Sequence, residues 1–84
     1  MKKELTKEDL TAGHCYSAKK PSKVGLFGYY NDREIVCLSP NTVQYDSPTV
    51  KIGRKRPTVP IGKFLSWAKE DITDLMPENG YWRE

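Results

Sequence analysis

The fold is decided by residues 33–46, which read REIVCLSPNTVQYD. From Ile35 onward the first half of this stretch is β-branched or apolar on both faces, a pattern typical of a strand. Pro40 and Asn41 follow at the second and third positions of a turn, where proline presets the backbone angle and asparagine tolerates unusual ones. Alternation of apolar and polar residues resumes at Val43. Residues 33–46 are therefore predicted to form a β-hairpin.

Short strands and turns extend from both ends of this hairpin. Upstream, residues 14–18 alternate and predict a first strand, and residues 19–31 hold two glycines among aromatic residues, which indicates a long, bent excursion. Downstream, the apolar positions change phase, so a bulge or bend is expected at Ser47-Pro48. A basic turn at 53–56 then leads into a short last strand at 57–59.

The periodicity changes after Pro60. Apolar residues then recur at spacings of three and four, which predicts an amphipathic helix of about three turns over residues 60–72. The helix is expected to pack its apolar side on the sheet. The residues predicted to lie mainly in the core are Ile35, Cys37, Val43, Tyr45, Val59, Phe64, Leu65 and Ala68.

Four or five short strands followed by one helix predict a mainly β fold with one C-terminal helix. It is expected to be a small SH3-like antiparallel barrel or a strongly bent sheet, as one domain over residues 1–76 with a tail at 77–84. Thr6 and Asp9 predict a capped helical turn near the start of the chain. The lead-in Leu10-Thr11-Ala12-Gly13, which precedes a strand with an inward aromatic residue, resembles the start of many bacterial SH3-like barrels. Such an architecture carries no function with it.

The chain has 84 residues, with 14 Lys and Arg against 11 Asp and Glu. This length leaves room for one small domain and excludes a large catalytic cleft between two lobes or a doubly wound sheet with a cofactor crevice. No apolar run approaches the ~20 residues that a membrane span requires, so a soluble cytoplasmic protein without membrane contact is expected. Cys15 and Cys37 are expected as thiols, with no disulfide, metal or cofactor.

Two groups of reactive residues bear on catalysis. His14 and Cys15 are neighbours on a predicted strand, so their side chains point to opposite faces and cannot act as a pair. Asp32 and Glu34 flank Arg33 and could serve as paired carboxylates, but such a trio more often closes a hairpin and pairs with nearby cations. The sequence therefore indicates a non-enzymatic protein without catalytic or metal-binding residues.

Charge is distributed unevenly along the chain. Residues 14–63 hold nine Lys and Arg against three Asp and Glu, whereas residues 64–84 hold two against five. A basic middle favours an anionic partner, and the alternative is a solvated surface with an acidic last helix. Most of the cations in the middle segment gather in two predicted loops, 19–30 and 53–56.

These two loops are expected to form the contact surface of a small binding module. Basic groups interleaved with exposed aromatic rings are typical of single-stranded nucleic-acid binding, so nucleic acid is the first expected partner. Phe27 is expected inside the fold. The alternative is a protein-interaction module or small regulator that docks through its aromatic loop, a sheet edge, Trp67 or Tyr81-Trp82. The oligomeric state stays open, and the candidate binding residues are Lys19, Lys20, Lys23, Tyr29, Tyr30, Arg54, Lys55 and Arg56.

Overall fold

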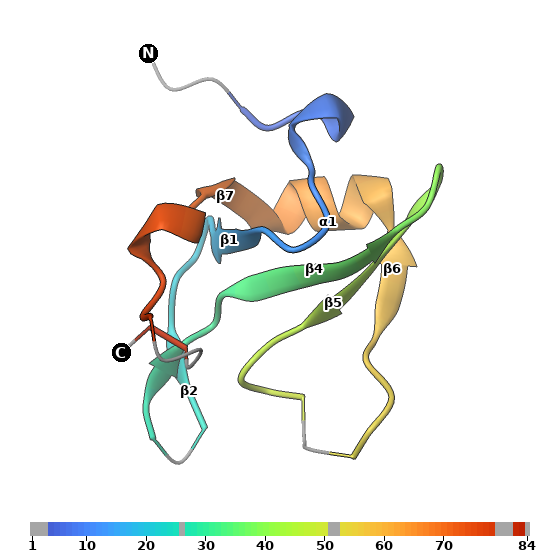
Figure 1. Ribbon diagram of the computed structural model, residues 1–84. Helices are drawn as coiled ribbons and strands as arrows, with labels where there is room; N and C mark the ends of the chain where they lie inside the picture. Colours follow the sequence, from blue (N-terminus) through green and yellow to red (C-terminus); the bar gives the residue numbers. More distant parts are fainter. Residues whose placement is uncertain (1–3, 26, 51–52, 79–81, 84) are drawn as a thin grey trace.

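The predicted hairpin supplies the central strand of the sheet and its neighbour. The computed structural model describes residues 4–25, 27–50, 53–78 and 82–83. Within them lie η1 (Lys7–Asp9), β1 (Cys15–Ala18), β2 (Lys23–Val24), β3 (Tyr29–Tyr30), β4 (Arg33–Leu38), β5 (Thr42–Asp46), β6 (Thr58–Pro60), α1 (Ile61–Trp67), β7 (Ala68–Asp71) and η2 (Thr73–Leu75). Five of these strands form an antiparallel sheet in the order β6-β5-β4-β1-β7, and β2 pairs with β3 separately (Figure 1).

The pairing of β4 with β5 contains an irregularity that overturns one core prediction. Ile35 pairs with Tyr45 and Leu38 with Val43, but the register shifts between Ile35 and Cys37. An extra residue in one strand breaks the simple alternation of faces beyond it. Cys37, predicted to lie in the core, is therefore exposed.

The core lies between the sheet and α1, which crosses one face of the sheet (Figure 1). The fully buried ring of Phe64 lies at its centre, 5.7 Å from the Tyr16 ring and 6.2 Å from the Tyr45 ring, measured between centroids. Val59 and Leu65 are partly buried and pack against this cluster. The core predictions for Ile35, Val43, Tyr45, Phe64 and Ala68 are confirmed.

The predicted helix over 60–72 is wrong in its last third. The helix ends at Trp67, and at Ala68 the backbone turns extended, with φ −79° and ψ 136°. The following residues form β7, which pairs with β1. Ala68 is buried in the cluster around Phe64, whereas Ile72, which follows β7, is buried outside that cluster. The spacing of three and four therefore marks buried residues here without marking a continuous helix.

The capped turn near the start of the chain is confirmed. The backbone N–H of Thr6 donates to Asp9 Oδ2 at 2.8 Å, and η1 follows. The buried Tyr16 holds the lead-in against the sheet, since its hydroxyl donates to the Asp9 carbonyl at 3.1 Å and accepts from the Thr11 N–H at 2.9 Å. The expected break at Ser47-Pro48 is the start of a turn that Val50 N–H closes onto Ser47 O at 3.0 Å.

The five-stranded sheet is open, with β6 and β7 as its edge strands in the part of the chain that the structure describes. The mainly β fold with one helix near the C-terminus is confirmed, whereas the closed barrel that was one of its two expected forms is not found. Among the described residues, no helix is both long and apolar enough to pass through a bilayer.

Candidate functional site

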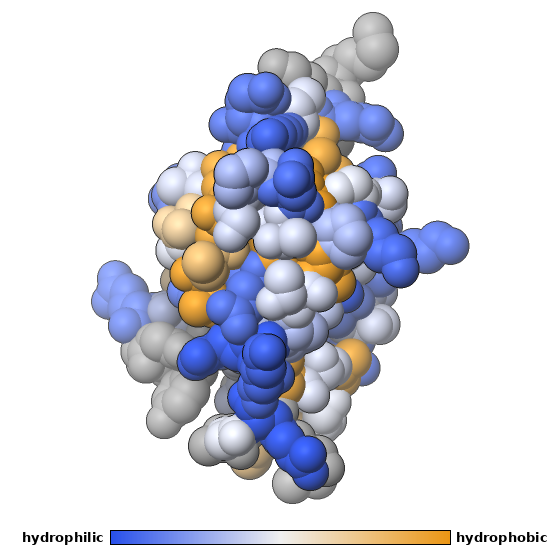
Figure 2. Space-filling model, turned by 90° about the vertical axis from the view of Figure 1, so that its right-hand side faces the viewer, coloured by the Kyte–Doolittle hydropathy of each residue, from blue (hydrophilic) through white to orange (hydrophobic). Residues whose placement is uncertain are grey.

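The two predicted basic loops lie at the same end of the molecule (Figure 1). A Cβ atom on Gly25 would lie 4.0 Å from the Pro48 carbonyl oxygen, so the loop that joins β1 to β4 approaches the loop that joins β5 to β6. We call this region the basic end and define it as residues 19–25, 27–33, 47–50 and 53–57 with Trp67. Figure 2 shows hydrophilic side chains over much of the visible face, including a column that runs from its middle to its lower end, where these loops lie.

The 19–32 loop is built as an ordered hairpin. Lys23 pairs with Tyr30 across β2 and β3, and Ser22 and Asn31 exchange hydrogen bonds just below this pair. The Gly28 N–H donates to the Gly25 carbonyl at 3.3 Å and closes the turn at the tip. Both glycines have φ near +70°, a conformation that L side chains rarely adopt. Phe27 is thereby held at the very end of the hairpin.

Phe27 is exposed over 73% of its surface, which corrects the expectation that it lies inside the fold. Its ring centroid is 5.9 Å from that of Tyr29, so the two rings form an aromatic pair at the loop tip. The aromatic rings of the core come instead from the strands and the helix, namely from Tyr16, Tyr45 and Phe64. An exposed phenylalanine beside basic residues is available to contact a partner.

Tyr30 is already contacted by two cations. The Lys23 ammonium lies 5.3 Å and the Arg83 guanidinium carbon 4.5 Å from its ring centroid, distances typical of cation–π contacts. Of the two tyrosines predicted as binding residues, Tyr29 is therefore the one beside the exposed ring, whereas Tyr30 serves packing within the loop.

The predicted cations differ in how they are engaged. Lys19 lies 4.0 Å from Glu4, and Arg56 Nε lies 3.6 Å from Asp46 Oδ2. Within the described ranges, exposed cations without an ion-pair partner at this end of the molecule include Lys20, Arg54 and Lys55.

Arg33 is a basic residue of this region that the sequence did not single out as a binding residue. Its guanidinium carbon lies 4.2 Å from the centroid of the Tyr45 ring and 4.1 Å from that of the Trp67 ring. Burial lowers the pKa of this half-buried guanidinium, which stays charged at neutral pH. The alternation of faces along β4 could have identified it, because Arg33 lies two residues before the core residue Ile35 and therefore on the same face.

The guanidinium of Arg33 has no hydrogen-bond acceptor among the described residues. Every fully buried side-chain nitrogen or oxygen in that part of the chain has a partner, so the nitrogens of Arg33 must reach solvent. Rings therefore contact the guanidinium while its N–H groups stay free. This arrangement is suited to an anionic ligand, because guanidinium groups hydrogen-bond phosphates and carboxylates in their own plane.

Arg33 lies between the bases of the two basic loops. The Lys19 N–H donates to the Trp67 carbonyl at 2.8 Å, which ties the start of one loop to one of its rings. The Tyr45 N–H donates to the Pro57 carbonyl at 3.1 Å, which ties the end of the other loop to the second ring. The structure therefore places Arg33 between the backbones of two loops that are far apart in the sequence.

A buried ion pair anchors the 19–32 loop from below. Asp32 is only 1% exposed, and Arg83 donates to its two carboxylate oxygens at 2.9 and 3.0 Å. The hydrogen bonds to Asp32 raise the pKa of Arg83. The Tyr30 N–H also donates to the Arg83 carbonyl at 2.9 Å. Sequence reasoning missed this pair, since nothing local connects residues 51 positions apart.

Cys15 and His14, the two residues considered above for nucleophilic catalysis, lie in environments that do not activate a nucleophile. Burial, with the negative charges of Glu34, Asp32 and Asp71, raises the pKa of the Cys15 thiol to about 11, so the thiol is protonated at neutral pH. His14 Nδ1 lies 2.7 Å from Asp71 Oδ2, a partner that the sequence did not predict. Within the described residues, no group of three or more His, Cys, Asp or Glu side chains is placed to hold a metal ion.

Compared with known proteins, the chain matches no protein-family model, no curated protein sequence and no solved structure.

Proposed function

We propose that this protein is a small, non-enzymatic binding module for single-stranded nucleic acid, and that the basic end is its contact surface. The observation that carries the proposal is the convergence of the two basic loops on the stacked guanidinium of Arg33. Phosphates would contact Arg33 together with the exposed cations Lys20, Arg54 and Lys55. The charge excess of residues 14–63 supplies the sequence-independent attraction.

The ring pair of Phe27 and Tyr29 would supply the stacking contacts of such a surface. Single-stranded nucleic acid presents base faces that stack on aromatic side chains with little regard to sequence. Phe27, held at the tip of the hairpin beside Tyr29, is placed to accept a base. Lys20 and Lys23 lie on the same loop and would contact the adjoining phosphates.

We also propose that the fold is SH3-like in its strand order. Three consecutive strands, β4, β5 and β6, are followed by a short helix, and the last strand returns to pair with β1. A long loop separates β1 from β4. These features are similar to those of SH3-like folds, although such a likeness favours no particular ligand.

A second candidate function is a protein-interaction module that uses the same surface. The exposure of Phe27 favours it, because an aromatic residue at a loop tip can fill a pocket on a protein partner. The two functions differ in their response to salt. Electrostatic binding to phosphates weakens steeply as salt rises, whereas insertion of an apolar ring into a protein pocket does not.

The proposal is tested with a fluorescein-labelled oligothymidylate whose anisotropy is followed at three salt concentrations. We expect binding at low salt, with the logarithm of the association constant falling linearly with the logarithm of salt concentration. Arg54→Gln and Lys55→Gln should each reduce this slope by roughly one unit. Lys63→Gln, which removes an exposed cation of α1 outside the basic end, is the matched control and should leave the slope unchanged.

The ring contribution is measured in the same titrations. Phe27→Ala should weaken binding by about 1–3 kcal/mol at every salt concentration, because stacking is hardly screened. Leu75→Ala removes another exposed apolar side chain, at 61% exposure, and should have no effect. Absence of binding by the unmodified protein even at low salt would overturn the nucleic-acid proposal and leave the protein-interaction alternative.

A further inference from the structure

A cavity lies on the face of the sheet opposite to Arg33. Cys15 pairs with Glu34 across β1 and β4, and Glu34 pairs with Asp46 across β4 and β5. Paired residues of neighbouring strands project on the same side, so these three side chains form a row. Arg33 precedes Glu34 on β4 and therefore projects to the other side, toward α1.

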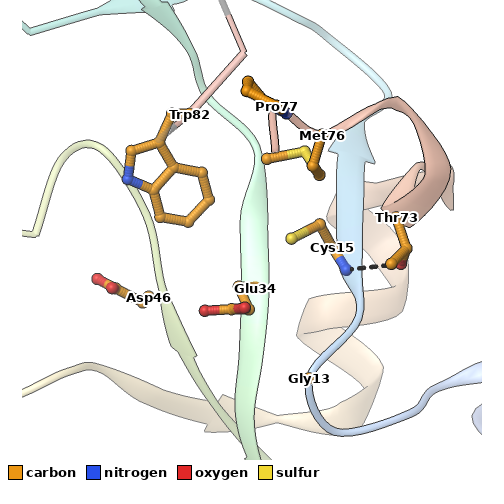
Figure 3. Close-up of a pocket in the computed structure, with 8 residues that line it drawn as sticks. All are labelled: Gly13, Cys15, Glu34, Asp46, Thr73, Met76, Pro77 and Trp82. Atoms are coloured by element: carbon orange, nitrogen blue, oxygen red, sulfur yellow. Dashed lines mark hydrogen bonds between the residues drawn. The ribbon is translucent and has the colours of Figure 1, made fainter. Parts of the chain in front are cut away.

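The chain after β7 covers this row and leaves a cavity of about 280 Å³. Figure 3 shows the Trp82 indole projecting toward the two carboxylates, with Met76 and Pro77 beside it. The Cys15 N–H donates to Thr73 Oγ1 at 3.1 Å and fixes the covering segment against β1. Pockets for drug-sized ligands begin at roughly 300 Å³, so this cavity suits one side chain or a molecule of similar size.

Two carboxylates, those of Glu34 and Asp46, line the cavity. Glu34 and Asp46 are directly opposite each other, an arrangement that costs stability when both carry charge. Asp46 accepts a hydrogen bond from the Ser47 N–H at 2.9 Å and lies 3.6 Å from Arg56. Glu34 has no hydrogen-bond or ion-pair partner among the described residues.

Cys15 lines the cavity, and its thiol is affected by the negative charge of Glu34. Cys15 is only 7% exposed, and its thiol projects into the space between the carboxylates and Met76 (Figure 3). After burial, the negative charge of Glu34 is the largest cause that raises the pKa of this thiol to about 11. A protonated thiol with two carboxylates is a poor donor set for a metal ion, since hard cations take six or more oxygen ligands.

We propose that this cavity binds the cationic end of a lysine or arginine side chain from a peptide partner. Glu34 and Asp46 would accept hydrogen bonds from the ammonium or guanidinium group, and the face of the Trp82 indole would contact the cation. Met76 and Pro77 would contact the apolar stem of the side chain. Asp46 is also 3.6 Å from Arg56 of this chain, whereas Glu34 has no partner among the described residues and would be the main acceptor.

This site does not depend on the proposed binding of nucleic acid, because its carboxylates project from the face of the sheet opposite to Arg33 and attract the opposite charge. If one proposal fails, the other still stands. If both hold, the protein presents an anion-binding end and a cation-binding cavity, and it would bridge a nucleic acid to a basic peptide segment.

The site is tested by NMR titration of the full chain with N-acetyl-arginine amide and N-acetyl-lysine amide. The chain has two tryptophans, and Trp82→Phe identifies which indole N–H signal belongs to Trp82. We expect saturable shifts of that signal and of the Met76 methyl signal, with the Trp67 indole unchanged. N-acetyl-norleucine amide has a similar stem without charge and should cause no saturable shift.

Glu34→Gln should weaken binding of both cationic probes by roughly tenfold, because it replaces a charged acceptor by a neutral one. Glu8→Gln, which removes an exposed carboxylate in η1, is the matched control and should leave the affinity unchanged. Binding of both probes to the unmodified protein should also weaken at high salt. Equal binding of the norleucine probe, no saturable shift at Trp82, or an unchanged affinity in Glu34→Gln would each overturn the proposal.

Discussion

Asp32 and Arg83 show how a single pair of residues fixes the geometry of the candidate site. The carboxylate is almost completely buried, and the Arg83 side chain, which is 27% exposed, is the partner that neutralises it. Removing one member of a buried ion pair leaves an uncompensated charge, which is far more costly than removing an exposed ion. The position of the 19–32 loop therefore depends on a residue next to the C-terminus.

Arg83→Met should lower the free energy of unfolding by about 3 kcal/mol, the low end of the range for breaking a buried pair, because Arg83 retains some exposure. Urea unfolding followed by circular dichroism measures this change. Arg54→Met, an exposed arginine without an ion-pair partner among the described residues, is the control and should change stability by less than about 0.5 kcal/mol. A second substitution, Asp32→Asn, should recover part of the loss. Equal stability of the two arginine variants would contradict the anchoring role.

The two cysteines should differ sharply in reactivity. At pH 8, a disulfide reagent such as DTNB should modify the exposed Cys37 in the folded protein and leave the buried, protonated Cys15 unmodified until denaturant is added. Equal rates for both thiols under native conditions would contradict the burial of Cys15.

Cys15 should also make stability depend on pH at the alkaline side. Its pKa is raised from 9.0 in the unfolded chain to about 11, so its contribution is complete below pH 9 and is lost as the pH rises through about 11. Cys15→Ala should therefore show a smaller fall in unfolding free energy over this range than the unmodified protein. Cys37→Ala, the control, should retain the fall.

At the residue scale, sequence reasoning could locate clusters of charge but not their partners. Lys20, Arg54 and Lys55 were found because runs of cations are visible in one dimension. Arg33 and Phe27 were not, since their importance depends on which rings meet across strands and which residue occupies the tip of a hairpin. Such contacts are set by tertiary structure, which overrides local pattern.

At the element scale, α1 should contribute to stability chiefly through Phe64. This ring is fully buried and contacts the rings of Tyr16, Tyr45 and Trp67. Phe64→Ala should cost about 3–5 kcal/mol, a large share of the stability available to so small a domain. The melting temperature measures the change against Leu65→Ala, which removes a partly buried side chain and should cost less. An unchanged melting temperature in Phe64→Ala would contradict the packing of α1 on the sheet.

The contact between β1 and β7 should be sensitive to acid. Burial alone would raise the pKa of Asp71, but hydrogen bonds from His14 and Thr73 outweigh it and lower that pKa below its ordinary value of 3.8. The contribution of Asp71 is therefore present above that value and is lost as the pH falls through the lowered pKa.

Asp71→Asn should make the unfolding free energy less dependent on pH in the acid range, as measured by urea unfolding at a series of pH values. Asp74→Asn, a substitution of an exposed carboxylate in η2, is the control and should leave the acid dependence as it is in the unmodified protein. An acid dependence that Asp71→Asn does not alter would contradict the assigned hydrogen bonds.

Elements were predictable where local sequence determines them. The β4–β5 hairpin follows from alternation and a proline–asparagine turn, both of which are contained within residues 33–46. The end of α1 does not follow in this way, because the apolar spacing of three and four continues past Trp67 to Ala68 and Ile72. Pairing with β1 decides between helix and strand, and that contact joins residues about 50 positions apart.

At the scale of the whole molecule, the open sheet and the meeting of the two loops depend on contacts between distant segments. The fold class could be predicted from the number and order of elements, whereas closure of a barrel requires its first and last edges to pair. In this chain the edge strands β6 and β7 do not pair within the described residues. Charges from separate loops converge because β1, β4 and β5 bring both loop bases to one end of the sheet.

The binding surface is tested most directly by an NMR footprint of an oligothymidylate on the 84-residue chain at low salt. Backbone amide shifts are expected to cluster in residues 19–33 and 53–57, with a shift of the Trp67 indole signal. The signals of Cys15, Thr73 and Met76, which line the cavity beside Glu34, are expected to stay in place. Shifts confined to the opposite face, or no shifts at all, would contradict the assignment of the basic end as the binding surface.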